Sequence, residues 1–376
     1  SNDGTVIPYA FDGRTGQASR IQPSATGAGG LTLKFYNEAQ FSYVNDSQIY
    51  ATYNGSGATL RTIDQYDFGT NVYTRLLDLD TLAPGLAGTY VGGVNSSAGP
   101  VERLVAFFGG TGQDRHHFVV VFDKSDPSRR RVLDTTASTL DGVPLATPLN
   151  FKLHHTTIDR SGRYVILYPT SADMASPRLA EHVYVWDTVT DVITPVVAAA
   201  HPNGHDAYGY GMVVNQDCCS TTKWDAAQWQ FRNLAAPLAP RDLILPNLAP
   251  KEIYLADHPA WQNARADVRV PAISALYRYG VNTTEWRAWD DEIVAVQTDV
   301  PDGVSATVWR LAHHRSDVAN DTDSSRIYFW YTPRPNVSPD GRWVLFTSNW
   351  EKTLGADTAP EPGGAFRQDV FLLRAR

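Results

Sequence analysis

The hairpin expected over residues 335–348 is the feature that most constrains the fold of this chain. Pro339-Asp-Gly341 supplies a turn, because proline presets its own φ and glycine accepts a positive φ. The Arg-Trp-Val-Leu-Phe-Thr run that follows is rich in aromatic and β-branched residues, which favours a strand. Weaker copies of the pattern stand at residues 156–168 and 41–53. A hairpin that recurs at such intervals predicts a repeated β-blade.

Composition points to the same class of structure. The chain contains 18 Tyr, 10 Trp and 14 Phe beside 28 Gly and 23 Pro, a balance that favours strands and turns over helices. Its 376 residues would ordinarily suggest two or more domains. A repeat architecture is the exception, because a closed ring can use the whole length. We therefore predict an all-β chain whose residues 1–376 form a single β-propeller domain.

The number of blades follows from the spacing of the strand-like units. Six units are recognisable, and the long intervals at 205–258 and 258–334 leave room for another. We predict a seven-bladed propeller, with six blades as the alternative. Strand-like segments around Asp12-Gly-Arg-Thr-Gly predict that an N-terminal strand completes the last blade and closes the ring, which removes the open sheet edges.

Charge and hydropathy exclude several classes of partner. The net charge of −8 provides no basic field for a nucleic acid. No run of about 18 apolar residues is present, so we expect no membrane span. Six Asn-X-Ser/Thr sequons favour a secreted or periplasmic protein, and we expect a monomer. The only cysteines, Cys218 and Cys219, are adjacent and form either two thiols or a strained vicinal disulfide.

Histidine, tyrosine and arginine residues recur just before the predicted hairpins. In a propeller the innermost strand of each blade lines the central channel, so residues at equivalent positions would converge on one concave mouth. A single buried histidine is more often a satisfied core residue, and the two tyrosines could simply pack. The candidates are His154, His155, His205, Tyr208, Tyr210, His258, Trp261, His314, Arg315 and Arg334.

Three kinds of chemistry are open to such a set. The histidines could bind a divalent metal such as Ca²⁺ or Mn²⁺. They could equally supply a general base and acid near neutral pH, with Arg334 neutralising an anion. Trp261 would suit stacking on a sugar ring. No Gly-X-Ser-X-Gly, phosphate loop or dinucleotide fingerprint is present. Acidic pairs such as Asp290-Asp291 look solvated, so a two-carboxylate glycosidase is not indicated.

Several segments together resemble the oligogalacturonate lyases, seven-bladed propellers of the broader TolB-like group. The opening Asp12-Gly-Arg-Thr-Gly and Phe35-Tyr-Asn-Glu-Ala-Gln-Phe look like the start of that family. The mid-chain Gln228-Trp-Gln-Phe-Arg-Asn and Asp257-His258-Pro-Ala-Trp261 look like its central segment, and the hairpin at 335–348 looks like its last blade. The Ser-Pro-Asp-Gly turn is shared by all TolB-like propellers and is specific for the fold alone.

The resemblance implies β-elimination on uronate glycans, with a metal held by histidine and glutamine residues at the channel mouth. His258 and Gln228 fall in comparable segments, and His205 would be a third ligand. Where the family places a histidine ligand in the last blade, this sequence has Arg334. In that respect the chain is similar to the ulvan lyases and the rhamnose–glucuronate lyases, which are also propellers.

Two main hypotheses follow. In the first, the chain is a lyase that cleaves an acidic polysaccharide or oligosaccharide. His155, His205, Tyr210 and Arg334 would be catalytic, and His154, Tyr208, His258, Trp261, His314 and Arg315 would bind substrate. Arg334 would stabilise the charge that develops on the uronate carboxylate. In the second, the chain is a noncatalytic TolB-like propeller that binds glycan or protein. A hydrolase would need paired carboxylates at the mouth, which the sequence does not place.

Overall fold

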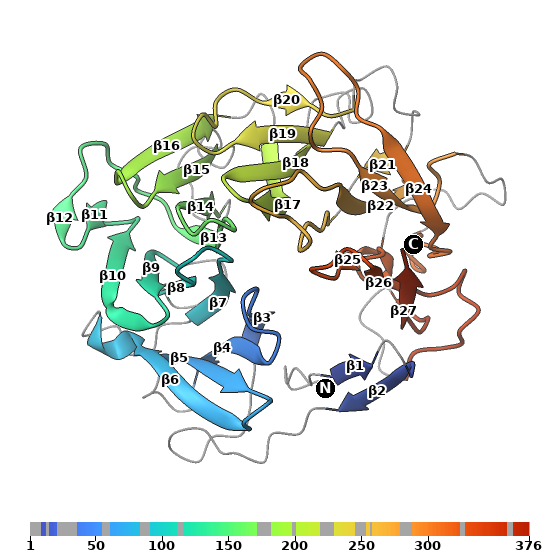
Figure 1. Cartoon of the computed structure of the whole chain (residues 1–376), viewed down its shortest axis with the longest axis horizontal. Coiled ribbons are helices and arrows are strands. Elements are labelled where there is room, and N and C mark those ends of the chain that lie inside the picture. The colour runs from blue at the N-terminus through green and yellow to red at the C-terminus, as the bar shows by residue number, and fades with distance from the viewer. Residues whose placement is uncertain are drawn as a thin grey trace. The chain divides into compact units, whose positions relative to one another are not determined.

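The computed structural model shows an all-β protein built from antiparallel sheets (Figure 1). It describes residues 9–12, 15–20, 36–54, 61–82, 91–110, 116–170, 182–197, 201–218, 229–244, 253–255, 258–278, 288–323, 328–358 and 364–375. Those residues form no α-helix, and the two short 3₁₀ turns are η1 (Leu79–Thr81) and η2 (Phe329–Tyr331). No helix in this part of the chain is long and apolar enough to cross a membrane. The chain divides into two compact units, Ser1–Pro195 and Val196–Arg376.

Within its described residues, the first unit contains a two-stranded sheet and three larger sheets. In each larger sheet the strands pair in chain order, as in a blade. The two-stranded sheet is β1 (Tyr9–Asp12) and β2 (Gln17–Arg20), and the first larger sheet is β3 (Tyr36–Phe41), β4 (Gln48–Asn54), β5 (Arg61–Asp67) and β6 (Val72–Asp78). The second larger sheet is β7 (Val91–Ser96), β8 (Arg103–Phe108), β9 (Phe118–Asp123), β10 (Asp126–Asp134), β11 (Thr139–Leu140) and β12 (Val143–Pro144). The third is β13 (Leu153–Ile158), β14 (Tyr164–Pro169), β15 (His182–Asp187) and β16 (Val192–Val197).

The second unit contains three sheets of the same kind. They are β17 (His201–Gly209), β18 (Met212–Cys218), β19 (Trp229–Asn233), β20 (Arg241–Asp242); β21 (Ile253–Leu255), β22 (Ala272–Arg278), β23 (Glu292–Val296), β24 (Val308–His313); and β25 (Asn336–Val337), β26 (Trp343–Ser348), β27 (Asp369–Arg374).

The core lies between consecutive sheets, which explains the continuous apolar runs in the middle strands. Five of the six residues in each of β8 and β9 are buried, because both faces of these strands are covered. The outer strand β10 is mostly exposed or half-buried and carries three consecutive arginines. Apolar clusters join each sheet to the next within a unit, and Trp186, Trp229 and Trp261 are almost fully buried in them. Burying one such side chain contributes about 2–3 kcal/mol.

The hairpin predicted at residues 335–348 is confirmed. β25 pairs with β26, with Val337 opposite Val344, and Gly341 has a φ of +72°. The copies at 156–168 and 41–53 are confirmed as the β13–β14 and β3–β4 hairpins.

A serine or aspartate side chain closes the turn in three hairpins, β25–β26, β13–β14 and β7–β8. Ser338 Oγ accepts a hydrogen bond from the Trp343 amide at 3.0 Å, and Asp159 Oδ1 accepts one from the Tyr164 amide at 2.8 Å. Ser97 Oγ accepts in the same way from the Arg103 amide at 2.9 Å in the β7–β8 hairpin. These side chains satisfy backbone donors that the turn would otherwise leave unpaired, so they fix where each blade begins.

Other expectations meet the structure in different ways. β1 and β2 pair with each other, and the sheet that ends the chain has three strands within the described residues, so ring closure and blade count stay predictions. His116 is buried: it is 2% exposed, with its Nδ1 3.1 Å from the Gly109 carbonyl oxygen. Cys219 and the side chain of Cys218 lie outside the described residues, as does any bond between them.

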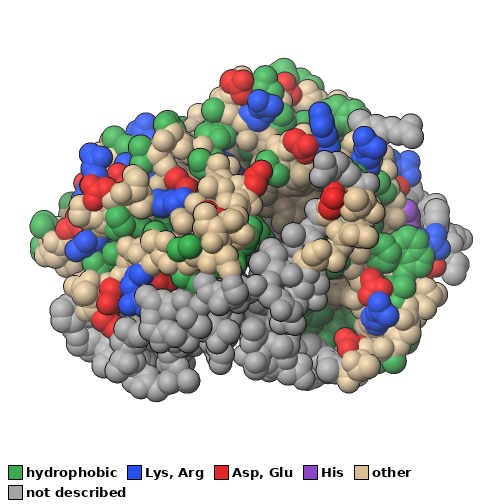
Figure 2. Space-filling model, turned by 60° about the horizontal axis from the view of Figure 1, so that its bottom comes forward, with side chains coloured by type: hydrophobic (Ala, Val, Ile, Leu, Met, Phe, Trp, Pro, Cys, Tyr) green, Lys and Arg blue, Asp and Glu red, His purple; other side chains and the backbone are tan. Residues whose placement is uncertain are grey.

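Charges of both signs are interspersed over the described surface in Figure 2, with no broad basic area on that face. This agrees with the net charge of −8.

Candidate functional site

Four polar residues, three of them predicted from the sequence, stand at near-equivalent positions before the turn of the first hairpin in their sheets. Positions are counted back from the last residue that pairs with the second strand before the turn. In the four hairpins this residue is Ile158, Gly209, Ala260 and Val337. His155, Asp206 and Arg334 stand three residues before that pair, and His258 stands two before it. Each of these hairpins therefore has a titratable or charged residue two or three positions before the last pair that precedes its turn.

Two of these residues meet on one aromatic ring in the second unit. The guanidinium of Arg334 lies over the Phe329 ring at 4.3 Å and over the Trp330 ring at 4.7 Å. Arg334 Nη2 also donates to the Phe329 carbonyl oxygen at 3.3 Å. The His258 imidazole meets Phe329 edge-on, with 5.7 Å between ring centroids. We call His258, Phe329, Trp330 and Arg334 the Arg334 cluster.

The Arg334 cluster faces solvent with its aromatic part. Phe329 is 45% exposed and Trp330 is 48% exposed, which is unusual for side chains of this size. A cation over an aromatic face is stabilised by about 0.5–1 kcal/mol at an exposed site. The arrangement therefore holds a positive charge in place beside apolar surface, and this combination suits a ligand that carries both a ring and a carboxylate.

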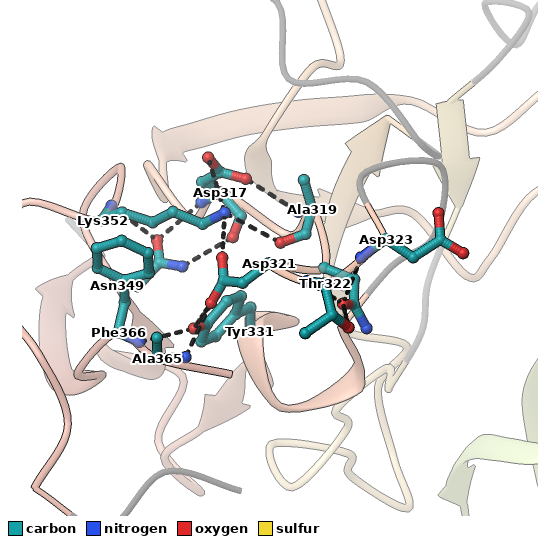
Figure 3. Close-up of polar contacts among 11 residues, drawn as sticks. Asp317, Ala319, Asp321, Thr322, Asp323, Tyr331, Asn349, Lys352, Ala365 and Phe366 are labelled. Atoms are coloured by element: carbon teal, nitrogen blue, oxygen red, sulfur yellow. Dashed lines mark hydrogen bonds and ion pairs between the residues drawn. The ribbon is translucent and has the colours of Figure 1, made fainter. Parts of the chain in front are cut away.

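The short turn η2 that carries the two exposed rings is anchored by Tyr331 (Figure 3). The Tyr331 hydroxyl donates to Asp321 at 2.6 Å and accepts from the Phe366 amide at 2.8 Å. Burial, followed by the hydrogen bond to Asp321, raises the pKa of Tyr331 to about 12. The phenol therefore remains a donor at physiological pH.

Lys352 completes this anchor from the other side (Figure 3). Its Nζ lies 2.6 Å from Asp321 and 3.6 Å from Asp317, and it donates to the Ala319 carbonyl oxygen at 3.1 Å. Burial alone would raise the pKa of Asp321. The hydrogen bond from Lys352 and the other hydrogen bonds to this carboxyl outweigh burial and keep the pKa below its usual value. The loop that holds Tyr331 is thus tied down by a central ammonium group.

His258 has a strained backbone conformation. Its φ is +98°, a value that a residue with a Cβ rarely adopts and that costs on the order of 1–3 kcal/mol. Two residues later, Ala260 and Ile273 exchange both backbone hydrogen bonds, and the Trp261 indole donates to the Val270 carbonyl oxygen at 3.0 Å. These neighbours fix the strand on the C-terminal side of the strained residue.

Trp261 itself belongs to the core. It is 2% exposed and packs on Gly209 of β17, where a Cβ would come within 2.7 Å of the ring. Tyr210 packs partly buried against the same cluster. Trp261 therefore offers no open face for a sugar, and the exposed Trp330 of the Arg334 cluster does.

A second buried polar pair lies on β17. The Tyr208 hydroxyl donates to Asp206 Oδ2 at 2.8 Å. Burial raises the pKa of Asp206 to about 7, although Tyr208 and the charge of Arg232 oppose the shift, and burial also raises the pKa of Tyr208. The pair could hold a proton near neutral pH, which is a property of acid–base sites.

His314 and Arg315 have structural partners. His314 is fully buried, with Nε2 2.9 Å from the Leu276 carbonyl oxygen and Nδ1 accepting from the Ser316 amide at 3.0 Å. Burial lowers its pKa to about 3, so the ring is neutral. Arg315 pairs with Glu351 at 2.9 Å and lies over Trp350. Both ring nitrogens of His314 are thus engaged by the backbone.

In the first unit, His155 stacks on Tyr168, its partner across the β13–β14 pair. Their ring centroids are 4.0 Å apart, and the exposed His154 meets His155 edge-on at 5.2 Å. The two histidines predicted from the sequence therefore do form one group with a tyrosine.

Of the three predicted metal ligands, the structure describes the side chain of His258 alone. Gln228 and the side chain of His205 lie outside the described residues, whereas His258 belongs to the Arg334 cluster. Among the described residues, no group of three His, Cys, Asp or Glu side chains could hold a metal ion.

The sequence reasoning missed Phe329 and Trp330. The run Tyr328-Phe-Trp-Tyr331, directly before Arg334, was the available signal. Four consecutive aromatic residues cannot all enter the core from a short turn, and the structure buries Tyr328 and Tyr331 while exposing the two between them.

Together, the sheets, the hairpins and the shared strand positions define a β-propeller protein with an aromatic and cationic surface. No family model matches the chain, and no curated protein matches it. Among solved structures, the chain is similar to an oligogalacturonate lyase in complex with manganese, with a TM-score of 0.52 and 13% identity over 92% of this chain and 80% of that one. This likeness shows the propeller fold.

Other propellers are similar at lower scores. The Dos1 propeller gives a TM-score of 0.45 and 11% identity, covering 90% of this chain and 70% of that one. A TolB protein from Agrobacterium tumefaciens gives 0.40 and 10%, covering 82% of this chain and 83% of that one. The resemblance to oligogalacturonate lyases seen in the sequence is found again in the fold.

Proposed function

We propose that this protein is a polysaccharide lyase that cleaves a uronate-containing glycan by β-elimination. The observation that carries the proposal is the Arg334 cluster, where a fixed guanidinium and a histidine share the ring of Phe329 beside an exposed tryptophan. The similarity in fold to an oligogalacturonate lyase supports the same class of substrate.

In the proposed reaction a base removes the proton at C5, the carbon next to the uronate carboxylate. The electron pair forms the C4–C5 double bond, the bond from C4 to the leaving glycosidic oxygen breaks, and an acid returns a proton to that oxygen. Negative charge builds up on the carboxylate as the C5 proton leaves. Arg334 would bind this carboxylate through two parallel N–H···O bonds, which stabilise the charge in the transition state.

His258 is the candidate base, because it contacts the same Phe329 ring as Arg334. An imidazole suits this task because it titrates near neutral pH. His155, His205 and Tyr210 remain candidates for the acid, and Trp330 replaces Trp261 as the proposed sugar-stacking residue. His154 and Tyr208 stay proposed substrate contacts. A divalent metal at His205, Gln228 and His258 stays part of the proposal, in line with the manganese of the similar lyase.

A noncatalytic propeller that binds an acidic glycan is the second candidate. It is favoured by the chemistry of the Arg334 cluster, which contains one titratable imidazole and no carboxyl or phenol group. Binding needs only the guanidinium and the exposed rings. Under either candidate we propose a secreted or periplasmic monomer.

A screen of uronate polysaccharides for the ultraviolet absorbance of the unsaturated product, with and without chelator, separates the candidates. For the lyase, Arg334→Gln should lower the rate by about 100-fold or more, and Arg342→Gln, on an exposed turn, should not change it. Equal rates for wild type and Arg334→Gln would overturn the assigned role. Saturable glycan binding without any unsaturated product across the screen would favour the binding protein.

A further inference from the structure

Two arginines share one buried ring at a different place in the second unit. Arg241 on β20 is the direct strand partner of Phe231 on β19, and its guanidinium lies 4.9 Å from the Phe231 ring. Arg269, from the loop between Trp261 and Pro271, lies 4.8 Å from the same ring. Phe231 is only 6% exposed, so both guanidiniums lie close to one buried ring.

Within the part of the chain that the structure describes, neither guanidinium forms an ion pair with a carboxylate. The nearby carboxylates have other partners: Asp242 accepts from Gln230 at 3.2 Å, and Asp299 accepts from Gln297 at 3.0 Å. Arginines elsewhere in the chain do form direct pairs, such as Arg163 with Asp187 at 2.7 Å. The Arg241–Arg269 pair therefore differs from the usual surface arginine of this protein.

The two charges also repel each other. Burial lowers the pKa of Arg269, the charge of Arg241 lowers it further, and Asp299 opposes the shift only in part. Since both guanidiniums lie within 5 Å of one ring, their carbon atoms are no more than about 10 Å apart. An oxyanion between the two guanidiniums would accept an N–H···O bond of about 2.9 Å from each of them.

We propose that Arg241, Arg269 and Phe231 form a site for an oxyanion, either the sulfate or the carboxylate group of an acidic glycan or a free anion of the same chemistry. A bound oxyanion removes the repulsion between the two arginines and receives charge-assisted hydrogen bonds from both. The site uses β19, β20 and the 261–271 loop, and shares no residue with the Arg334 cluster. It extends glycan contact beyond the proposed lyase site and does not depend on catalysis.

Calorimetric titration of the whole chain at low salt tests the site, with sodium sulfate, a sulfated disaccharide and a diuronate as separate probes. Arg241→Gln and Arg269→Gln should each weaken binding about 10-fold or more, because each removes one charge-assisted contact. Arg265→Gln is the matched control, since Arg265 lies on the same loop and has its own partner, Asp267, at 3.7 Å. The control should bind as wild type does.

Thermal unfolding with and without sulfate distinguishes a variant that has lost the site from a variant that does not fold. Sulfate should raise the Tm of the wild type and of Arg265→Gln but not that of the other two variants, whose Tm without sulfate should not fall, because each loses a repelling charge. Tighter binding of a disaccharide than of sulfate assigns the site to a glycan, and equal affinity assigns it to a free anion. Sulfate and saccharide binding unchanged in both variants, or absent in the wild type, would overturn the proposal. Since Arg334→Gln leaves the Arg241–Arg269 pair intact, failure here is distinguishable from failure of the lyase assignment.

Discussion

The Arg334 guanidinium and the His258 imidazole contact the same phenyl ring, at 4.3 Å and 5.7 Å from the centroid of Phe329. Arg334 stands three residues before the Val337–Val344 pair of its hairpin, and His258 stands two residues before the Ala260–Ile273 pair. The shared ring fixes the spacing between a permanent charge and a titratable group. A ligand held by that charge would therefore lie against the exposed aromatic surface beside it.

Trp330→Ala should weaken binding of an acidic oligosaccharide by about 10-fold, because an exposed tryptophan beside an anchored charge is a typical hot spot. The matched control is Trp309→Ala on the outer strand β24, since Trp309 is 44% exposed and Trp330 is 48% exposed. Affinity electrophoresis against a uronate polysaccharide measures both. Equal retardation of the two variants would count against the Arg334 cluster as the glycan site.

Lys352→Met should lower the free energy of unfolding by about 2 kcal/mol, because it leaves Asp321 and Asp317 without their ammonium partner. The value lies below that for a fully buried pair because Lys352 keeps 19% side-chain exposure, so water partly screens the charges. The substitution also removes the ammonium group that lies over the rings of Tyr331 and Phe366, at 5.7 Å and 5.4 Å from their centroids. Urea unfolding followed by fluorescence gives the difference.

The control for this change is Arg342→Met, which removes an exposed pair 3.8 Å from Asp340 and should cost about 0.5 kcal/mol or less. Adding Asp321→Asn to Lys352→Met should restore part of the loss, because it removes one uncompensated charge. A Lys352→Met unfolding curve that overlays the wild type would show that the anchor does not stabilise the loop around η2.

The sequence was sufficient for the fold because the hairpin signal is local. The turn at Pro339-Asp-Gly341 and its copies depend on the backbone preferences of a few adjacent residues, and the structure has all three hairpins where they were predicted. Blade closure depends on contacts between residues far apart in the chain, which a local pattern does not encode. For that reason the local pattern predicts an N-terminal strand without fixing the strand to which it pairs.

The site was less predictable because burial is a property of the packed molecule. Trp261 and Trp330 are the same residue type, yet Trp261 packs on Gly209 while Trp330 lies on the surface. His314 was expected at a mouth, and its two nitrogens instead bond to the backbone. Arg334 was selected for its position before a hairpin, and the ring that orients it was outside that pattern.

Below pH 6.5, His314 should contribute to acid destabilisation. Burial lowers its pKa from 6.5 to about 3, so as pH falls the unfolded chain takes up a proton before the folded one. Its contribution to stability is complete above pH 6.5 and is lost progressively as pH falls towards 3. The groups that face the ring are the Leu276 carbonyl, the Ser316 amide, the Asp291 carboxylate at 4.0 Å and His313.

The measurement is the free energy of unfolding against pH for wild type and His314→Gln. The slope between pH 6.5 and 4 should be smaller in the variant, whatever its stability at neutral pH. His154→Gln serves as control because His154 is exposed, and it should keep the wild-type slope. Parallel curves for wild type and His314→Gln would contradict the assignment of a buried neutral ring.

Gly162→Ala should cost more stability than Gly142→Ala, although both glycines have a positive φ, of +76° and +81°. The strain of a left-handed alanine is common to both and is about 1 kcal/mol. At Gly142 a new Cβ meets nothing within 4 Å, whereas at Gly162 it would lie 2.9 Å from Ser97 Oγ and 3.2 Å from Ser97 Cβ.

Ser97 cannot move aside without cost, because its Oγ accepts from the Arg103 amide and so closes the neighbouring hairpin. Gly162→Ala should therefore lose about 2–3 kcal/mol in total, with the excess over Gly142→Ala measuring how tightly the two hairpin turns pack. Urea midpoints of the two variants at equal m-value provide the comparison. Equal losses would mean that backbone strain alone selects glycine in these turns and that the contact between neighbouring blades adds nothing.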